Sequence, residues 1–289
     1  MFGAVAKWPP LKYPLPGSRE GISINRNSVS RVSVEGLPEF LFEIASDERL
    51  GILATVSARP MKHAEIARAL SMTGSETTRH LRRLTTTGLI EKSPEGEYGP
   101  TQLAETLRTG LPFFEFLVAH RRFLQHHRLP VLDRAFVERL GELTQASLVH
   151  GTYQVVALQE SSLRAVKRRI WVLTEQRFEQ ALPIFREKMA VGADIRVIRP
   201  RASITEERRT GRIVHRNFPL RVLPNVDTFL AVLDEQAGLC LAGPDGRTDM
   251  GTMLLVTDPE GYRWAEDVFL WYWDRAEVWH ATGTADPPG

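Results

Sequence analysis

Two short helical segments, separated by only four residues, set the geometry of the N-terminal half of this chain. The first, His63–Leu70, has one narrow apolar face. Residues 71–74 link it to a second helical segment, Ser75–Thr87, which Gly88 ends. A link this short turns the second helix steeply across the first and makes it project from the body. The spacing therefore predicts a helix-turn-helix.

A small hairpin follows the second helix. Residues 89–92 and 98–101 have the character of short strands, and residues 93–97 have the composition of a turn. Two earlier helices, at residues 37–44 and 47–58, can supply the rest of a core. Together these elements predict a winged helix-turn-helix over residues 37–111.

The second helix of the motif has an apolar side and a polar side. At 100° per residue, Thr77, Leu81 and Leu84 share the inner side. Guanidinium and hydroxyl groups, which bind base edges and phosphates in a major groove, occupy the outer side and its flanks. The side chains that we expect to contact double-stranded DNA are Ser75, Glu76, Thr78, Arg79, His80, Arg82, Arg83 and Thr86, with Lys92 on the wing.

Some of these assignments leave alternatives. Glu76 can read a cytosine amino group or simply favour the positive end of the helix. The wing tip carries Glu95 and Glu97, which argues against a close approach to DNA. A charged outward face on a lone helix is usually a solvated face, but here it belongs to a complete winged pattern.

Charge supports a local interface. The chain has 37 Lys and Arg against 35 Asp and Glu over 289 residues, which excludes a uniformly basic wrapper of nucleic acid. Residues 61–92 nevertheless hold six basic against three acidic residues. A DNA contact would therefore depend on this segment.

The C-terminal half has an α/β pattern. Strands at Arg169–Thr174 and Asp194–Ile198 flank a helix at Phe178–Val191, which predicts a β-α-β unit. Further strands are expected at residues 153–158, 220–223, 228–233 and 239–241, and further helices at residues 113–128, 132–143 and 261–279. The fold class we expect is a two-domain α+β or α/β chain with a mixed sheet.

Composition divides the chain into four parts. We expect a Pro-rich mobile arm at residues 1–36 with one possible strand at 28–34, then the winged domain at 37–111. Residues 112–282 would form linker helices and an effector-sensing, dimerising α/β domain, and residues 283–289 a disordered tail. No run of 18 apolar residues and no secretory signal is present, so we expect a cytoplasmic protein without a membrane span.

Enzyme motifs are missing from the sequence. It contains no G-x-G-x-x-G, no P-loop, no H-E-x-x-H and no G-x-S-x-G. It also lacks the H-x-K triplet that phospholipase-D-like catalysis requires. We therefore expect no enzymatic activity and no cofactor.

Basic residues gather in the C-terminal half as well. Residues 186–221 hold ten basic and four acidic residues, and Arg199-Pro200-Arg201 follows a predicted strand, where α/β sheets tend to place ligands. We consider a small anionic effector held by Trp171, Arg196, Arg199, Arg201 and His215. The alternative is an exposed basic segment at residues 205–216.

A metal site is disfavoured. His120 lies six or seven positions from His126 and His127, which is not a ligating spacing, and Cys240 lies in an apolar strand. The tryptophans of the last helix could line an aromatic pocket, but core and dimer packing is the better interpretation.

The sequence also resembles known families. Ser75–Leu84 with Gly88-Leu89-Ile90 resembles the recognition segment of arsenic-repressor-like winged-helix regulators. A second set of fragments resembles the archaeal regulators of methanogenesis and filament formation: Leu129-Pro130, Phe136, Arg139–Leu143, Trp264–Phe269 and Tyr272-Trp273. The resemblance covers residues 37–280. It implies an archaeal, ligand-responsive transcription regulator that binds specific DNA sequences as a homodimer, with a winged helix and a sensor domain.

One competing hypothesis comes from another class. The chain could be an enzyme or adaptor whose winged helix docks a protein. Docking modules usually present apolar or acidic residues on the face where this chain has three arginines.

Overall fold

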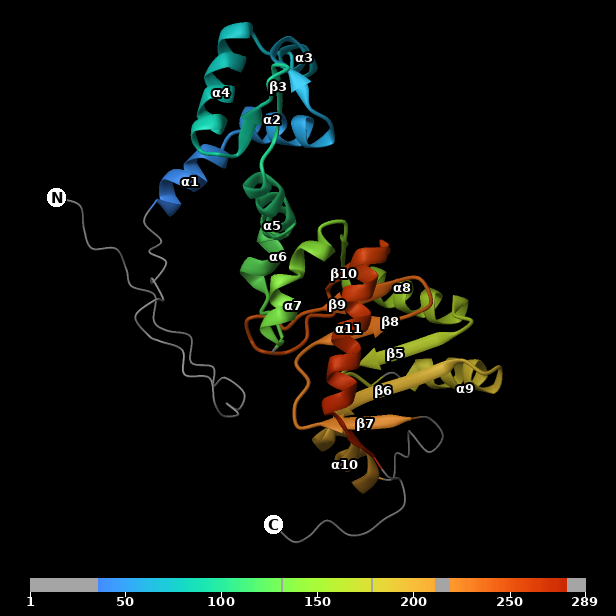
Figure 1. Ribbon diagram of the computed structural model, residues 1–289. Coiled ribbons are helices and arrows are strands. Elements are labelled where there is room, and N and C mark those ends of the chain that lie inside the picture. Colours follow the sequence, from blue (N-terminus) through green and yellow to red (C-terminus); the bar gives the residue numbers. More distant parts are fainter. Residues whose placement is uncertain (1–35, 131, 178, 211–218, 280–289) are drawn as a thin grey trace, which may run out of the picture.

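A computed structural model describes residues 36–130, 132–177, 179–210 and 219–279. An N-terminal unit of helices and a small sheet is joined by a long helix, α5, to an α/β unit (Figure 1). The predicted arm and tail, and His215, lie outside the described residues.

The N-terminal unit is a winged helix-turn-helix, as the sequence predicts. Its elements are α1 (Leu37–Ile44), α2 (Asp47–Ala58), β1 (Met61–Lys62), α3 (His63–Ala69), α4 (Gly74–Thr86), β2 (Ile90–Lys92) and β3 (Glu97–Pro100). The three strands form an antiparallel sheet in the order β1-β3-β2. The hairpin of β2 and β3 is the wing.

One apolar core holds this unit together. Ile52 and Val56 of α2, Ile66 of α3 and Leu84 of α4 are fully buried, and Leu81 nearly so. These positions follow the helical spacing that places them on inward faces. The core therefore fixes which side of α4 faces outward.

The connection between the units is helical. It comprises α5 (Gln102–Ala119), α6 (Arg121–His126), α7 (Arg134–Glu138) and the 3-10 turn η1 (Leu140–Leu143). The domain division expected at 111/112 falls inside α5, beside Pro112. At this point Gly141 packs on α5, and the Thr144 hydroxyl donates to the Pro112 carbonyl over 3.1 Å. The lower half of α5 is therefore fixed to the C-terminal unit.

The C-terminal unit is built on a mixed sheet. Its elements are β4 (Ser147–His150), α8 (Thr152–Ala165), β5 (Arg169–Leu173), η2 (Glu179–Ala181), α9 (Leu182–Ala190), β6 (Asp194–Pro200), α10 (Arg201–Arg209), β7 (Leu220–Leu223), β8 (Phe229–Val232), β9 (Ala237–Cys240), β10 (Thr252–Val256), α11 (Pro259–Arg275) and β11 (Glu277–Val278). The order is β11-β7-β6-β5-β8-β9-β10-β4. Strands β5, β6 and β7 run parallel and the other pairs antiparallel, which confirms the predicted mixed sheet and β-α-β unit.

Each face of this sheet has its own core. On one face α11 crosses the strands (Figure 1), and Trp264 and Phe269 pack with Trp171 and Ile198. On the other face, residues of α8 and α9 such as Val155 pack on the alternate strand positions. Helix α11 begins at the Asp258 cap, whose side chain accepts from the Gly261 N–H.

Several predicted elements differ from the structure. The strand expected at residues 153–158 is the first half of α8, which starts after Gly151 with φ 96°. Strands β4 and β10 were missed, and the helix expected at residues 113–128 begins earlier and breaks at His120. Within the described ranges, no helix is long and apolar enough to cross a bilayer.

Candidate nucleic-acid interface

The start of α4 is fixed by a reciprocal cap. The Thr73 hydroxyl accepts from the Glu76 N–H, and the Glu76 carboxylate accepts from the Thr73 N–H over 2.9 Å and from its hydroxyl over 2.7 Å. The Thr73 hydroxyl and backbone N–H lower the pKa of Glu76. Glu76 therefore caps the helix, which is the second of the two roles considered for it.

The outward side of α4 carries the predicted contact groups. Ser75, Arg79, Arg82 and Thr86 are all exposed, each about one turn from the next. Thr85, which the sequence analysis did not select, is exposed beside them. These five side chains form the outer face of α4, and it combines guanidinium and hydroxyl groups.

The structure corrects the assignment of His80. Its side chain is 6% exposed and faces the core, so it cannot reach a groove. Burial and the positive charge of Arg79 lower the pKa of His80. The neutral ring has its Nε2 3.3 Å from Arg79 Nη2, where it accepts a hydrogen bond. His80 therefore positions Arg79.

Arg83 is also corrected. Its guanidinium donates twice to the Glu43 carboxylate of α1, from Nε over 2.8 Å and from Nη2 over 2.7 Å. It also lies over the Phe42 ring, 5.2 Å from the centroid. These contacts turn Arg83 toward α1.

Arg49 was missed by the sequence analysis. It is 4% exposed, and it donates to the carbonyls of Phe42, over 2.6 Å, and Glu43. The last carbonyls of a helix need such partners because no further turn supplies them. Arg49 thus closes the end of α1, and no local sequence signal points to it.

Thr78 and Lys92 occupy the edges of the interface. The Thr78 hydroxyl donates to the Gly74 carbonyl over 2.8 Å and lies 2.9 Å from His63 Nε2, which ties α4 to α3. Lys92 is exposed on the wing, with its ammonium 5.5 Å from the Tyr98 ring centroid. Both side chains are exposed.

Residues 46–92 match the bacterial regulatory protein family arsR. That segment contains α2, α3, α4 and β2, and it supports a DNA-binding regulator. No curated protein sequence matches the chain.

Solved structures give only distant likenesses. The archaeal chromatin protein TrmBL2 is 17% identical over 84% of this chain and 97% of its own, with a TM-score of 0.36. The phospholipase D family member Nuc from Salmonella typhimurium is 13% identical over 47% of this chain and 100% of its own, also at 0.36. The methyltransferase SibL is 15% identical over 67% of this chain and 66% of its own, at 0.26. Scores this low establish no shared function.

Four of the five residues expected to bind an anion are described, and these four do not form one site. Arg196 and Arg199 lie on opposite faces of β6 because side chains alternate along a strand. Arg196 pairs with Asp194 over 3.1 Å, and Arg201 pairs with Glu277. Each of these cations already has a carboxylate.

Trp171 is held inside a stack. The central guanidinium carbons of Arg169 and Arg196 lie 4.1 and 4.4 Å from its ring centroid, and the Phe269 ring stacks on it. Its Nε1 donates to Asp194 over 2.9 Å. Trp171 is 4% exposed and belongs to the core between the sheet and α11.

Arg199 belongs to a buried ion cluster. It and Glu207 are each 2% exposed, and the Glu207 carboxylate lies 2.9 Å from Arg199 and 3.1 Å from Arg177. Burial lowers the pKa of Arg199. The cluster anchors α10 to β6.

The histidines and the cysteine considered for a metal lie apart. His127 bonds to Asp249 over 2.8 Å, and His120 is buried against Phe116. Burial raises the pKa of the Cys240 thiol to about 12. In the described ranges, no three His, Cys, Asp or Glu side chains come together to hold a metal ion.

Proposed function

We propose that this chain is a transcription regulator that binds specific DNA sequences through the outer face of α4. One observation carries the proposal. Arg79 and Arg82 project from a helix-turn-helix, and neither forms an ion pair with a described carboxylate. Arginine in that position can bond guanine edges and phosphates.

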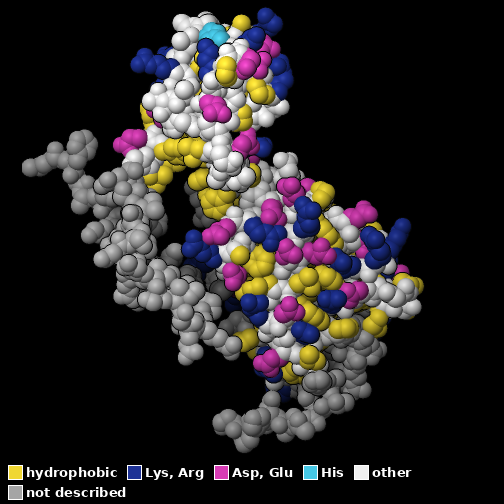
Figure 2. Space-filling view, viewed as in Figure 1, with side chains coloured by type: hydrophobic (Ala, Val, Ile, Leu, Met, Phe, Trp, Pro, Cys, Tyr) yellow, Lys and Arg dark blue, Asp and Glu magenta, His cyan; other side chains and the backbone are white. Residues whose placement is uncertain are grey.

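The regulator would act as a homodimer. Apolar side chains are exposed on α1, at Leu37, Leu41 and Phe42, and on α5, at Phe114 and Val118. Figure 2 shows hydrophobic side chains gathered over these two helices. Exposed apolar patches mark interaction surfaces. A two-fold dimer formed there would place two copies of α4 in successive major grooves, about 34 Å apart.

We further propose that the C-terminal unit binds a small ligand, and that the chain regulates transcription and does not catalyse a reaction. A ligand that binds the DNA-bound dimer about tenfold more tightly than the free dimer raises the DNA affinity by the same factor. The shift would reach α4 through α5, because η1 packs on α5.

Selection from a random duplex library tests the proposal. We expect two-fold symmetric sites with half-sites one helical turn apart. The affinity should fall linearly with salt on logarithmic axes, since bound phosphates release counterions. Arg79→Ala and Arg82→Ala should weaken binding, whereas Arg134→Ala, an exposed arginine of α7, should not. Absence of DNA binding at low salt would favour the protein-docking hypothesis.

A further inference from the structure

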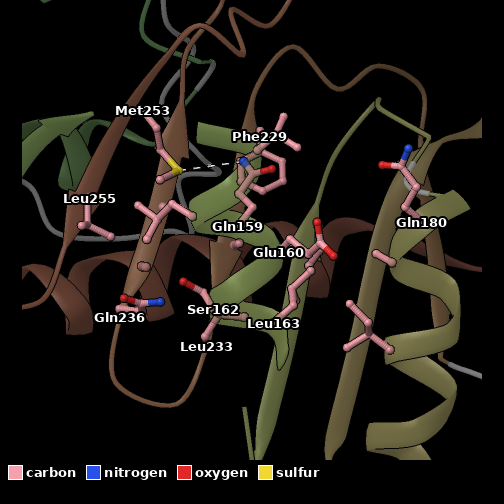
Figure 3. A pocket seen from close by; sticks show the side chains of 18 of the residues that line it. Gln159, Glu160, Ser162, Leu163, Gln180, Phe229, Leu233, Gln236, Met253 and Leu255 are labelled. Atoms are coloured by element: carbon pink, nitrogen blue, oxygen red, sulfur yellow. Dashed lines mark hydrogen bonds between the residues drawn. The ribbon is translucent and has the colours of Figure 1, made fainter. Parts of the chain in front are cut away.

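A cavity of about 80 Å³ lies on the sheet of the C-terminal unit, opposite α11 (Figure 3). Helix α8 packs on β4 and β10 at one end of the sheet, and α9 packs on β6 nearer the other end. The central strands β5, β8 and β9 lie between them, and their side chains form the floor. The cavity is therefore the space that two separated helices leave open.

Small side chains keep this space empty. Ala231 of β8 lies directly opposite Gly238 of β9, and Ala181 borders the same space from η2. A Cβ on Gly238 would lie 2.7 Å from Met253 Sδ. The Met253 sulfur fills the space over Gly238, so it is Ala231 and Ala181 that leave room for a ligand where neighbouring positions carry Val, Leu or Phe.

The lining is apolar with a few amides. None of the described residues that line it is Lys or Arg, and the one carboxylate, Glu160, pairs with Arg164 over 2.7 Å. Gln159, Gln180 and Gln236 supply amide groups, the latter two on opposite sides (Figure 3). An anion would find no cation here, and its desolvation would be uncompensated.

One of these amides has a weak partner that a ligand can replace. Gln159 Nε2 donates to Met253 Sδ over 3.9 Å, beside the Phe229 ring (Figure 3). A thioether sulfur is a poor acceptor. A carbonyl or hydroxyl oxygen of a ligand would accept the same N–H more strongly.

We propose that this cavity binds an uncharged, mainly apolar small molecule, such as an aromatic ring with one hydrogen-bonding group. The inference rests on the proposed function and names the class of its effector. An enclosed cavity of about 150 Å³ takes up benzene. This one has about half that volume, 80 Å³, but it is open between α8 and α9, so part of the ring and its substituent can lie outside the enclosed space.

The packing of α8 suits ligand entry. Only Val155 of its 14 residues is buried, while Leu158 and Leu163 are half-buried at the cavity wall. A ligand would bury both side chains and draw α8 toward the sheet. Because β4 leads into α8 and follows η1, which packs on α5, this movement starts near the connection to the winged unit.

Benzamide and benzoate are matched probes because they share a shape and differ in charge. We expect calorimetric titration of the full chain, without DNA, to detect benzamide and to show at least about tenfold weaker binding of benzoate. Ala231→Leu, which fills the floor, should abolish benzamide binding. Ala157→Leu, on the exposed side of α8, should leave it unchanged.

A second variant keeps the test valid if Ala231→Leu does not fold. Ser162→Phe fills the cavity from the half-exposed side of α8 and should also abolish binding while the thermal transition is retained. The proposal is overturned if neither benzamide nor toluene binds, if benzoate binds as tightly, or if a folded filled variant binds normally. Since no DNA is present, failure here leaves the DNA-binding proposal to its own test.

Discussion

Arg83 of α4 and Glu43 of α1 form a bidentate ion pair across 40 positions of sequence, with N–O distances of 2.8 and 2.7 Å. The hydrogen bonds from Arg83 lower the pKa of the Glu43 carboxyl. The pair lies against Phe42 and holds α1 to α4. Two adjacent arginines therefore have different surroundings: Arg83 is ion-paired within the unit, and Arg82 is exposed.

We therefore expect the substitution of each arginine by alanine to have a different effect. Arg82→Ala should weaken binding to a selected duplex by about 1–3 kcal/mol if it contacts a base edge. Arg83→Ala should weaken binding less but speed hydrogen exchange of α1, because its ion pair is internal. Fluorescence anisotropy and hydrogen exchange measure the two effects. Equal loss of DNA affinity in both variants, with unchanged exchange in α1, would contradict the distinction.

The contact of η1 with α5 has no room for a methyl group. A Cβ on Gly141 would lie 2.7 Å from the Phe113 nitrogen and 2.8 Å from the Pro112 carbonyl carbon. Both are backbone atoms, so Gly141→Ala should destabilise the chain by about 1–3 kcal/mol in urea unfolding. Gly110→Ala is the control: nothing lies within 4 Å of its Cβ, and helical alanine is favoured. Equal stability of the two variants would show that the contact is not tight.

The local parts of the interface could be predicted from the sequence. The lengths of α3, the turn and α4 follow from near-neighbour patterns, and the structure places them within a residue or two. The sequence could not show whether His80 is buried, because it lies at the border between the inner and outer sides of α4. Packing against α2 decides whether its side chain is exposed. The partner of Arg83 is likewise set by tertiary structure, since Glu43 belongs to a separate helix.

In the C-terminal unit, most of β6 could be predicted from the sequence, but its end and the cavity could not. The predicted strand ended at Ile198 and left Arg199 outside it. The structure extends the strand to Pro200, and the period of two then places Arg196 and Arg199 on opposite faces, which conflicts with the expected anion site. The cavity has no sequence signal. It depends on the small side chains of Ala231 and Ala181 and on the separation of α8 from α9.

Cys240 should be inert in the folded protein. It is fully buried in β9, and burial raises its pKa to about 12, so neither access nor thiolate is available at pH 8. We expect no labelling by Ellman's reagent in native buffer and complete labelling in guanidinium. Rapid stoichiometric labelling of the native protein would show that β9 opens readily or that the strand is misplaced.

Asp234 should make stability depend on pH in the acid range. Burial raises its pKa, but N–H donations from Lys167, Arg169 and Arg168, over 2.8, 2.7 and 3.0 Å, outweigh this and lower it below the ordinary value of 3.8. The charged acceptor stabilises the start of β5, so Asp234→Ala should cost about 2 kcal/mol at pH 7 in urea unfolding.

A lowered pKa fixes the sign of this effect. The contribution is complete above the unfolded pKa and is lost as pH falls through the folded value. The difference between wild type and Asp234→Ala should therefore shrink as unfolding is measured from pH 5 down to the lowest pH at which both are folded. Asp245→Ala, which removes an exposed acceptor of one N–H, should change stability little at any pH. A constant difference for Asp234→Ala would mean that the neutral side chain makes the same contacts.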